Sequence, residues 1–147
     1  MILLDDHLVR DLAAGQLPAE IDTVEDLATT NLWLFRLASS LAREGLGGSL
    51  SGAIRGLGVD ELARFRLELT DQLETLTVVP LREIVWSMAE LQRQHAEAGR
   101  RLSTIMVEAL AAAHFLGAEI AVSAIDVGPG LRAAAEADAV AFRVISN

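Results

Sequence analysis

The amino-acid sequence predicts an α/β fold in which helices cover both faces of a mainly parallel sheet, a three-layer α/β/α sandwich. Short apolar, β-branched-rich runs alternate along the chain with longer segments whose apolar residues recur at helical spacing. The first run, Ile2–Leu4, is continuously apolar, which is typical of a strand that is buried on both faces. Alternation of this kind predicts parallel strands joined by helical crossovers.

Four strands are expected in chain order. The first is the run at residues 2–4, and the second covers residues 75–79, where β-branched residues lead to Pro80. The third covers residues 119–123 and the last covers residues 140–145.

The first helix is expected to follow Asp6, which suits an N-cap, and to stop at Gly15 and Pro18. The weak capping-box pattern at residues 23–26 introduces a helical pattern that continues to Arg43. A break at residues 29–31 would divide this segment, so the sequence leaves one helix or two open.

The remaining helices follow the same rules of spacing and capping. Helical patterns begin at Asp60 and at Leu81, and the second of these ends in a polar segment at residues 94–101. Ser103 or Thr104 caps a further apolar helix that Gly117 closes, and a short helix covers residues 131–137.

The glycine-rich run at residues 45–52 invites comparison with a phosphate-binding loop. Such loops follow a strand and open a helix, so that backbone N–H groups point at the anion. Here the run follows a helical pattern and contains no Gly-Lys-Ser/Thr sequence. A helix–helix connection is therefore expected.

Composition limits the kind of protein. A chain of 147 residues with 52% hydrophobic residues suits one folded domain, and the absence of cysteine excludes disulfides and thiolate metal sites. A membrane span needs about 20 apolar residues, whereas the best candidate, residues 105–118, is interrupted by Glu108 and His114. No signal peptide is recognisable. A soluble, cytoplasmic protein without membrane contact is expected.

The net charge of −9 disfavours broad contact with nucleic-acid phosphates. All twelve basic residues are arginine. A local arginine-lined groove, or a metal site that turns carboxylates into a phosphate-binding surface, remains compatible with this charge.

Carboxylates stand where two predicted strands end. Asp5 and Asp6 follow the first strand, and Asp126 lies just beyond the third. In a parallel sheet these ends share one edge, where open α/β sheets bind ligands. Carboxylates there could hold Mg²⁺ or Mn²⁺ and so promote phosphodiester cleavage. The alternative is that Asp6 only caps a helix and Asp126 only forms a turn.

Residues 2–10 resemble the opening of a response-regulator receiver domain, which also carries an acidic pair after its first strand. That family needs a lysine after its last strand, and this chain contains none. No aspartate follows an apolar strand in the middle third of the chain either. The resemblance therefore fails beyond the first ten residues.

A broader resemblance covers most of the chain. Residues 78–83 lead a helix into residues 102–111, and Leu116 to Val122 then leads to Asp126 and the alanine-rich residues 131–135. This order is similar to the C-terminal half of PIN domains, including VapC-type toxins, and the first-strand Asp5 fits the N-terminal half. The resemblance implies a PIN-like sandwich and a ribonuclease whose three or four acids hold Mg²⁺ or Mn²⁺.

Under this resemblance Asp5 and Asp126 are the expected catalytic acids. Asp5, Asp6, Glu108 and Asp126 are the expected metal ligands. The chain departs from the family pattern at the two remaining acid positions.

The acid of the early helix falls near Leu34 or Phe35, where no carboxylate stands. The acid of the later helix falls near Met106. Glu108 lies two residues further on, about 200° around the helix from that position.

Three functions follow from these observations. The first is a toxin-like, metal-dependent ribonuclease in which Arg36 or Arg132 holds the substrate phosphate. The second is a PIN-like module that lacks activity and acts through binding or dimerisation. The third is another α/β domain, such as a small-molecule binder. RNA, an antitoxin-like protein and a second copy of the chain are the corresponding partners.

The histidines and tryptophans indicate no metal-binding or base-stacking site in the sequence. His7, His95 and His114 form no pair at metal-binding spacing, and His114 is expected as a half-buried side chain in an apolar helix. Trp33 and Trp86 have apolar neighbours at helical spacing, which favours core or subunit contact over base stacking.

Overall fold

The computed structural model describes residues 1–21, 26–42 and 56–146. Its centre is a five-stranded parallel sheet in the order β3-β2-β1-β4-β5. The strands are β1 (Ile2–Leu4), β2 (Leu27–Thr29), β3 (Thr77–Val78), β4 (Glu119–Ser123) and β5 (Phe142–Ile145). The helices are α1 (Asp6–Ala13), α2 (Asn31–Ala42), α4 (Val59–Thr75), α5 (Leu81–Glu97), α6 (Thr104–Leu116) and α7 (Pro129–Ala137), with a 3₁₀ turn at Ala124–Asp126.

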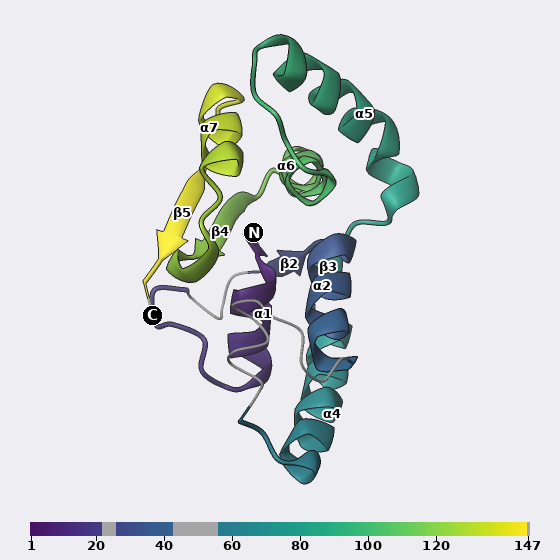
Figure 1. Ribbon diagram of the computed structural model, residues 1–147, viewed down its shortest axis with the longest axis vertical. Helices are drawn as coiled ribbons and strands as arrows, with labels where there is room; N and C mark the ends of the chain where they lie inside the picture. Colours follow the sequence, from purple (N-terminus) through teal and green to yellow (C-terminus); the bar gives the residue numbers. More distant parts are fainter. Residues whose placement is uncertain (22–25, 43–55, 147) are drawn as a thin grey trace.

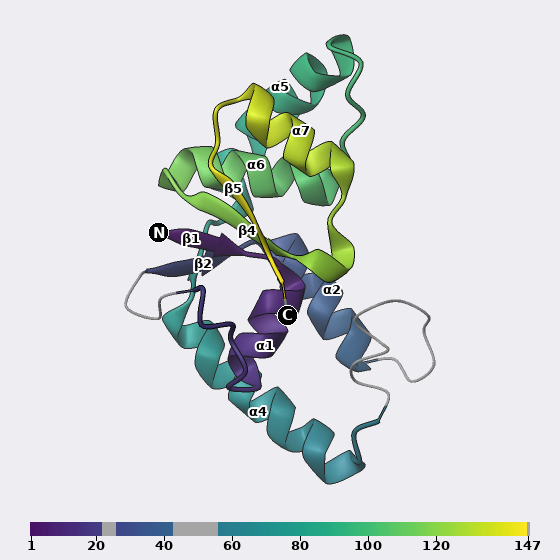
Figure 2. The same ribbon diagram turned by 90° about the vertical axis from the view of Figure 1, so that its left-hand side faces the viewer.

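The helices lie on both faces of the sheet, as the sequence predicts. Helices α5, α6 and α7 lie on one side, and α1 and α4 lie on the other (Figures 1 and 2). Alternate strand residues divide between the two layers: Leu3 and Ile120 belong to the core under α6 and α7, whereas Ile2 and Leu4 belong to the core with α1 and α4. The continuous apolar run of β1 is therefore explained by burial on both faces.

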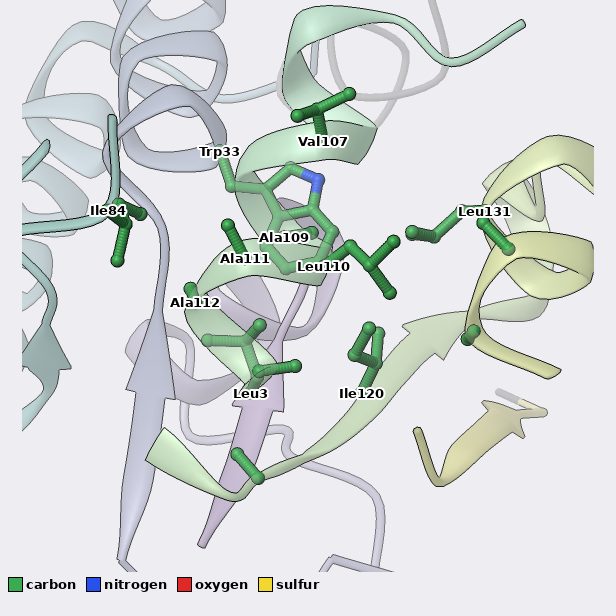
Figure 3. Close-up of a cluster of buried hydrophobic side chains, with 14 of the residues drawn as sticks. Leu3, Trp33, Ile84, Val107, Ala109, Leu110, Ala111, Ala112, Ile120 and Leu131 are labelled. Carbon is green, nitrogen blue, oxygen red and sulfur yellow. The ribbon is translucent and has the colours of Figure 1, made fainter. Parts of the chain in front are cut away.

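Helix α6 forms the centre of the larger core. Its alanines allow close approach to the sheet, and Figure 3 shows Trp33 of α2 lying against it near Leu110. Ser103 caps its first turn, and Gly117 ends it with a left-handed backbone (φ 61°), as expected. Trp33 is only 3% exposed, so of the expected core or subunit contact the core position is confirmed.

Strand β2 is not among the strands that the sequence predicts. The expected helical pattern from residue 23 onward is wrong at residues 27–29, which form this strand. Leu27 and Ala28 pair with Ile2 and Leu3 of β1, and the helix begins only at Asn31. Three residues are too few to show the alternation that marks a strand, so pairing with β1 decides their structure. The glycine-rich residues 45–52 lie outside the described residues.

The sheet order reverses between β1 and β4. From β1 the chain moves outward through β2 and β3, and it then returns to add β4 and β5 on the other side. Ligands of open α/β sheets bind at such a switch point, beyond the carboxyl ends of the strands. Residues after β1 and β4 therefore occupy the place where a site is expected.

Within the residues that the structure describes, no helix is both long enough and apolar enough to cross a membrane.

Candidate functional site

Asp5 lies where β1 ends, and its side chain joins β1, α1 and β4. It is 2% exposed. One oxygen, Oδ1, accepts a hydrogen bond from the backbone N–H of Leu8 (2.9 Å), and Oδ2 accepts one from that of Ser123 (2.9 Å). Asp5 is thus the N-cap of α1, and the expectation that Asp6 caps this helix is wrong.

Burial raises the pKa of Asp5 to about 7, and the nearby charge of Asp6 adds to this rise. The two backbone hydrogen bonds and the Arg36 guanidinium act in the opposite direction. Desolvation dominates because it penalises only the charged carboxylate. At neutral pH the Asp5 carboxyl group is therefore divided between its neutral and charged forms.

Arg36, on the face of α2 toward the strand ends, binds two carboxylates at once. Its Nε and Nη2 donate to the two oxygens of Asp6, the second at 2.6 Å, and Nη2 also lies 3.1 Å from Oδ2 of Asp126. Asp6 is fully buried, whereas Asp126 is 44% exposed at its side chain. The hydrogen bond to Asp6 raises the pKa of Arg36 further, so the guanidinium stays charged. We refer to Asp6, Arg36 and Asp126 as the arginine clamp.

A small pocket of about 70 Å³ opens beside the clamp. Its polar lining consists of Asp5, Arg36 and Asp126. The rest is mainly apolar and consists of Trp33, Ile105, Met106, Val122, Gly128, Leu131 and Phe142.

Met106 closes this pocket tightly. A Cβ atom added at Gly128 would come within 2.7 Å of the Met106 methyl group, so any side chain at position 128 would displace it. An apolar thioether therefore lies where the family resemblance implies a third acid.

Glu108 does not take part in this pocket. It is fully buried, and its carboxylate accepts hydrogen bonds from the backbone N–H groups of Asn31 (3.0 Å) and Leu32 (2.8 Å) and from the Asn31 side chain (2.9 Å). It thereby satisfies the first turn of α2, which is where a helix favours negative charge. Its two carboxylate oxygens are committed to holding α2 against α6.

The expected site residues are thus only partly brought together. Asp5 and Asp126 line one pocket, Asp6 is buried and pairs with Arg36 without lining it, and Glu108 lies elsewhere. Arg132 is exposed and pairs with Glu136 on α7 (3.1 Å). Among the described residues no group of three or more histidine, cysteine, aspartate or glutamate side chains is arranged to hold a metal ion.

The donor set also disagrees with a divalent cation chemically. Mg²⁺ and Mn²⁺ need several oxygen ligands and open positions for water. Here the charge of Asp6 and Asp126 is balanced by a guanidinium, whose planar fork of N–H groups matches carboxylates. A divalent ion would have to displace Arg36, because both cations would need the same carboxylates.

The structure also brings together two histidines and an aspartate that the sequence does not indicate as a group. His95 and His114 both reach Oδ2 of Asp138, at 3.1 and 3.4 Å. Their separation along the chain gives no spacing signal, and only the packing of α5 against α6 and α7 brings them together.

Solved structures of other proteins share this architecture. A structure of FitAB bound to an IR36 DNA fragment contains a chain with a TM-score of 0.59 and 16% identity, covering 99% of this chain and 94% of that one. FitAcB from Neisseria gonorrhoeae gives a TM-score of 0.53 at 18% identity over 97% of this chain and 96% of that one. PAE2754 from Pyrobaculum aerophilum gives 0.53 at 19% identity over 90% and 84%.

The fold is PIN-like. The α/β/α sandwich with a parallel sheet, predicted from the sequence, is confirmed by the strand order and by these likenesses. At these identities the likeness shows the fold alone. No family model matches the sequence, and no curated protein matches it.

Proposed function

We propose that this chain is a PIN-like binding module without metal-dependent nuclease activity. The observation that carries the proposal is the arginine clamp: a permanently charged guanidinium lies between Asp6 and Asp126, where the resemblance implies a divalent cation. The clamp supplies the positive charge that these carboxylates need for stability. Unlike a metal ion, a guanidinium has no open coordination position at which a water molecule could be activated.

The rest of the pocket supports the same conclusion. Met106 contributes a methyl group where a ligand is expected, and Glu108 is committed to α2. Of the carboxylates expected to bind metal, only Asp5 and Asp126 line the pocket. Two acids make a weak site for a hard dication, which prefers several oxygen ligands.

The partner of such a module is expected to be a protein. A net charge of −9 opposes general binding to nucleic acid. FitAB, which contains a chain of similar fold, is described in complex with a DNA fragment. The PIN resemblance implies an antitoxin-like protein partner. We therefore infer an assembly of the toxin–antitoxin kind, in which this chain contributes a protein-binding surface.

The runner-up is a metal-dependent ribonuclease, favoured by the position of Asp5 and Asp126 in one pocket. An RNA cleavage assay separates the two functions. The protein is incubated with a mixed-sequence RNA in Mn²⁺ or Mg²⁺, with and without EDTA. The module predicts no EDTA-sensitive cleavage by the unaltered chain.

Two variants identify any cleavage that does occur. Asp126→Asn changes a half-exposed side chain, so it tests the pocket with little risk to folding, and Asp5→Asn tests the buried acid. Cleavage that requires Mn²⁺ and is lost in both folded variants would establish the ribonuclease and reject the module. Cleavage that persists in both would come from a contaminating nuclease.

A further inference from the structure

A second, larger hollow of about 630 Å³ lies between α5, α6 and the end of α7. None of the described residues that line it also lines the carboxylate pocket. The residues that matter here are Trp86, Glu90, Leu91, Gln94, His114 and Asp138. We call this hollow the Trp86 groove, and none of the three residues of the arginine clamp lines it.

Trp86 is the most conspicuous side chain of the groove. It is 85% exposed, so the core position that its apolar neighbours at helical spacing favoured is wrong, and contact with another subunit stays a prediction. Val85 and Leu81 of the same helix are also exposed. Tryptophan is enriched at the centres of protein interfaces because its rigid indole gives much contact area at little entropic cost. This edge of α5 is therefore suited to contact with another molecule.

Asp138 supplies a carboxylate that His95 and His114 hold in position. The buried His95 accepts a hydrogen bond at Nδ1 from Nε of Arg100 (2.8 Å), so its Nε2 carries the proton that it donates to Oδ2 of Asp138 (3.1 Å). His114 lies on the other side, 3.4 Å from the same oxygen. A carboxylate fixed in this way needs no reorganisation to accept a ligand.

Glu90 places a second carboxylate in the groove. Hydrogen bonds from Arg93 and then from Gln94 lower the pKa of Glu90, so it is charged at neutral pH. Among the described lining residues there are two carboxylates and an indole, and Arg93, which does not line the groove, already pairs with Glu90 (2.6 and 3.1 Å), so a ligand would share this carboxylate with Arg93. An indole face with neighbouring carboxylates attracts a cation.

We propose that the Trp86 groove binds an arginine side chain of a basic protein partner. A guanidinium can stack on the indole of Trp86 while its N–H groups reach a carboxylate, and it is less strongly hydrated than an ammonium group. A basic partner also complements the net charge of −9. A symmetric contact with a second copy would instead bring Glu90 and Asp138 of the two chains together, which like charges oppose.

The test uses the two indole N–H signals in the ¹H–¹⁵N NMR spectrum of the whole chain. Trp33 is buried and serves as an internal reference for Trp86. The probe is a short acetylated peptide with two arginines, and the matched probe carries neutral citrulline at both positions. The arginine peptide is expected to shift the Trp86 signal saturably, and the citrulline peptide to bind at least about fivefold more weakly.

Matched variants separate the groove from general charge attraction. Glu90→Gln removes a groove carboxylate, whereas Glu68→Gln removes an exposed one on α4 that also pairs with an arginine. The first is expected to weaken binding of the arginine peptide at least about threefold, and the second to leave it unchanged. Trp86→Ala, at an exposed position that folding does not require, is expected to abolish the saturable shift of the backbone signals of α5.

Four outcomes would overturn the proposal. These are no Trp86 shift at millimolar peptide, equal binding of the citrulline peptide, and equal weakening by Glu68→Gln. The fourth is a Trp86 signal that depends on protein concentration without peptide, together with a dimer in sedimentation that Trp86→Ala removes. That result would assign the groove to a second copy of the chain. None of these outcomes affects the proposed absence of nuclease activity.

Discussion

Removal of Arg36 should destabilise the fold by about 3 kcal/mol. Asp6 is fully buried and receives both of its guanidinium hydrogen bonds from Arg36, the Nη2 bond being 2.6 Å long. Breaking a buried ion pair from one side costs about 3–5 kcal/mol, because the remaining charge has no partner. We take the lower end because the Arg36 side chain is 38% exposed, so water can reach the carboxylate that remains. The contact with the exposed Asp126 adds at most about 1 kcal/mol.

The assay is urea unfolding followed by circular dichroism for the unaltered chain, Arg36→Ala, Asp6→Asn and the double variant. A coupling free energy of about 2 kcal/mol or more is expected, with unchanged denaturant slopes. Arg132→Ala is the matched control, because Arg132 pairs with Glu136 in an exposed position and should change stability by less than about 0.5 kcal/mol. The reasoning is refuted if Arg36→Ala is no more harmful than Arg132→Ala, or if the coupling is near zero.

Further predictions concern the other carboxylates. Because the pKa of Asp5 is raised to about 7, the folded chain holds this proton more tightly than the unfolded chain, and its stabilising effect is lost as pH rises from about 4 to 7. Relative to the unaltered chain, Asp5→Asn should therefore gain up to about 4 kcal/mol between pH 4 and 8 in urea unfolding, and a pH-independent difference would contradict this. Glu108→Gln should cost about 2 kcal/mol through its lost acceptor at α2, whereas the exposed Glu83→Gln should cost nothing measurable; equal effects would reject the capping role. Arg36→Glu combined with Met106→Asp should make the melting temperature rise with Mn²⁺, and no response in the folded variant would show that the pocket geometry is unsuitable.

Much of the fold follows from local chemistry that the sequence displays. The continuous apolar run of β1, the cap at Ser103 and the left-handed end at Gly117 all depend on neighbouring residues. Strand β2 could not be predicted in the same way. Its three residues are strand-like only because β1 and β3 lie on either side of them.

The choice between Asp5 and Asp6 as helix cap shows a finer limit. Both residues are good caps, and the helix start differs by a single residue. The position of Ser123, which donates its N–H to Asp5 from the end of β4, favours Asp5. Asp5 and Ser123 lie 118 positions apart in the sequence, so no local sequence pattern predicts this contact.

The sequence predicts where the candidate site lies, but not which side chains form it. Strand ends and the PIN resemblance both indicate Asp5, and Asp126 does line the same pocket. The clamp depends on Arg36, which is distant in sequence from Asp6 and Asp126, and the sequence offered it only as a phosphate contact. Whether an arginine binds a ligand or a neighbouring carboxylate is decided by tertiary packing.

The most direct test of the central claim is calorimetric titration of the unaltered chain with Mn²⁺ at neutral pH. If the Arg36 guanidinium takes the place of the metal, no saturable binding is expected at concentrations up to about 1 mM, and Arg36→Glu with Met106→Asp provides the variant in which binding should appear. Saturable binding of one Mn²⁺ per chain that Asp126→Asn abolishes would contradict the account.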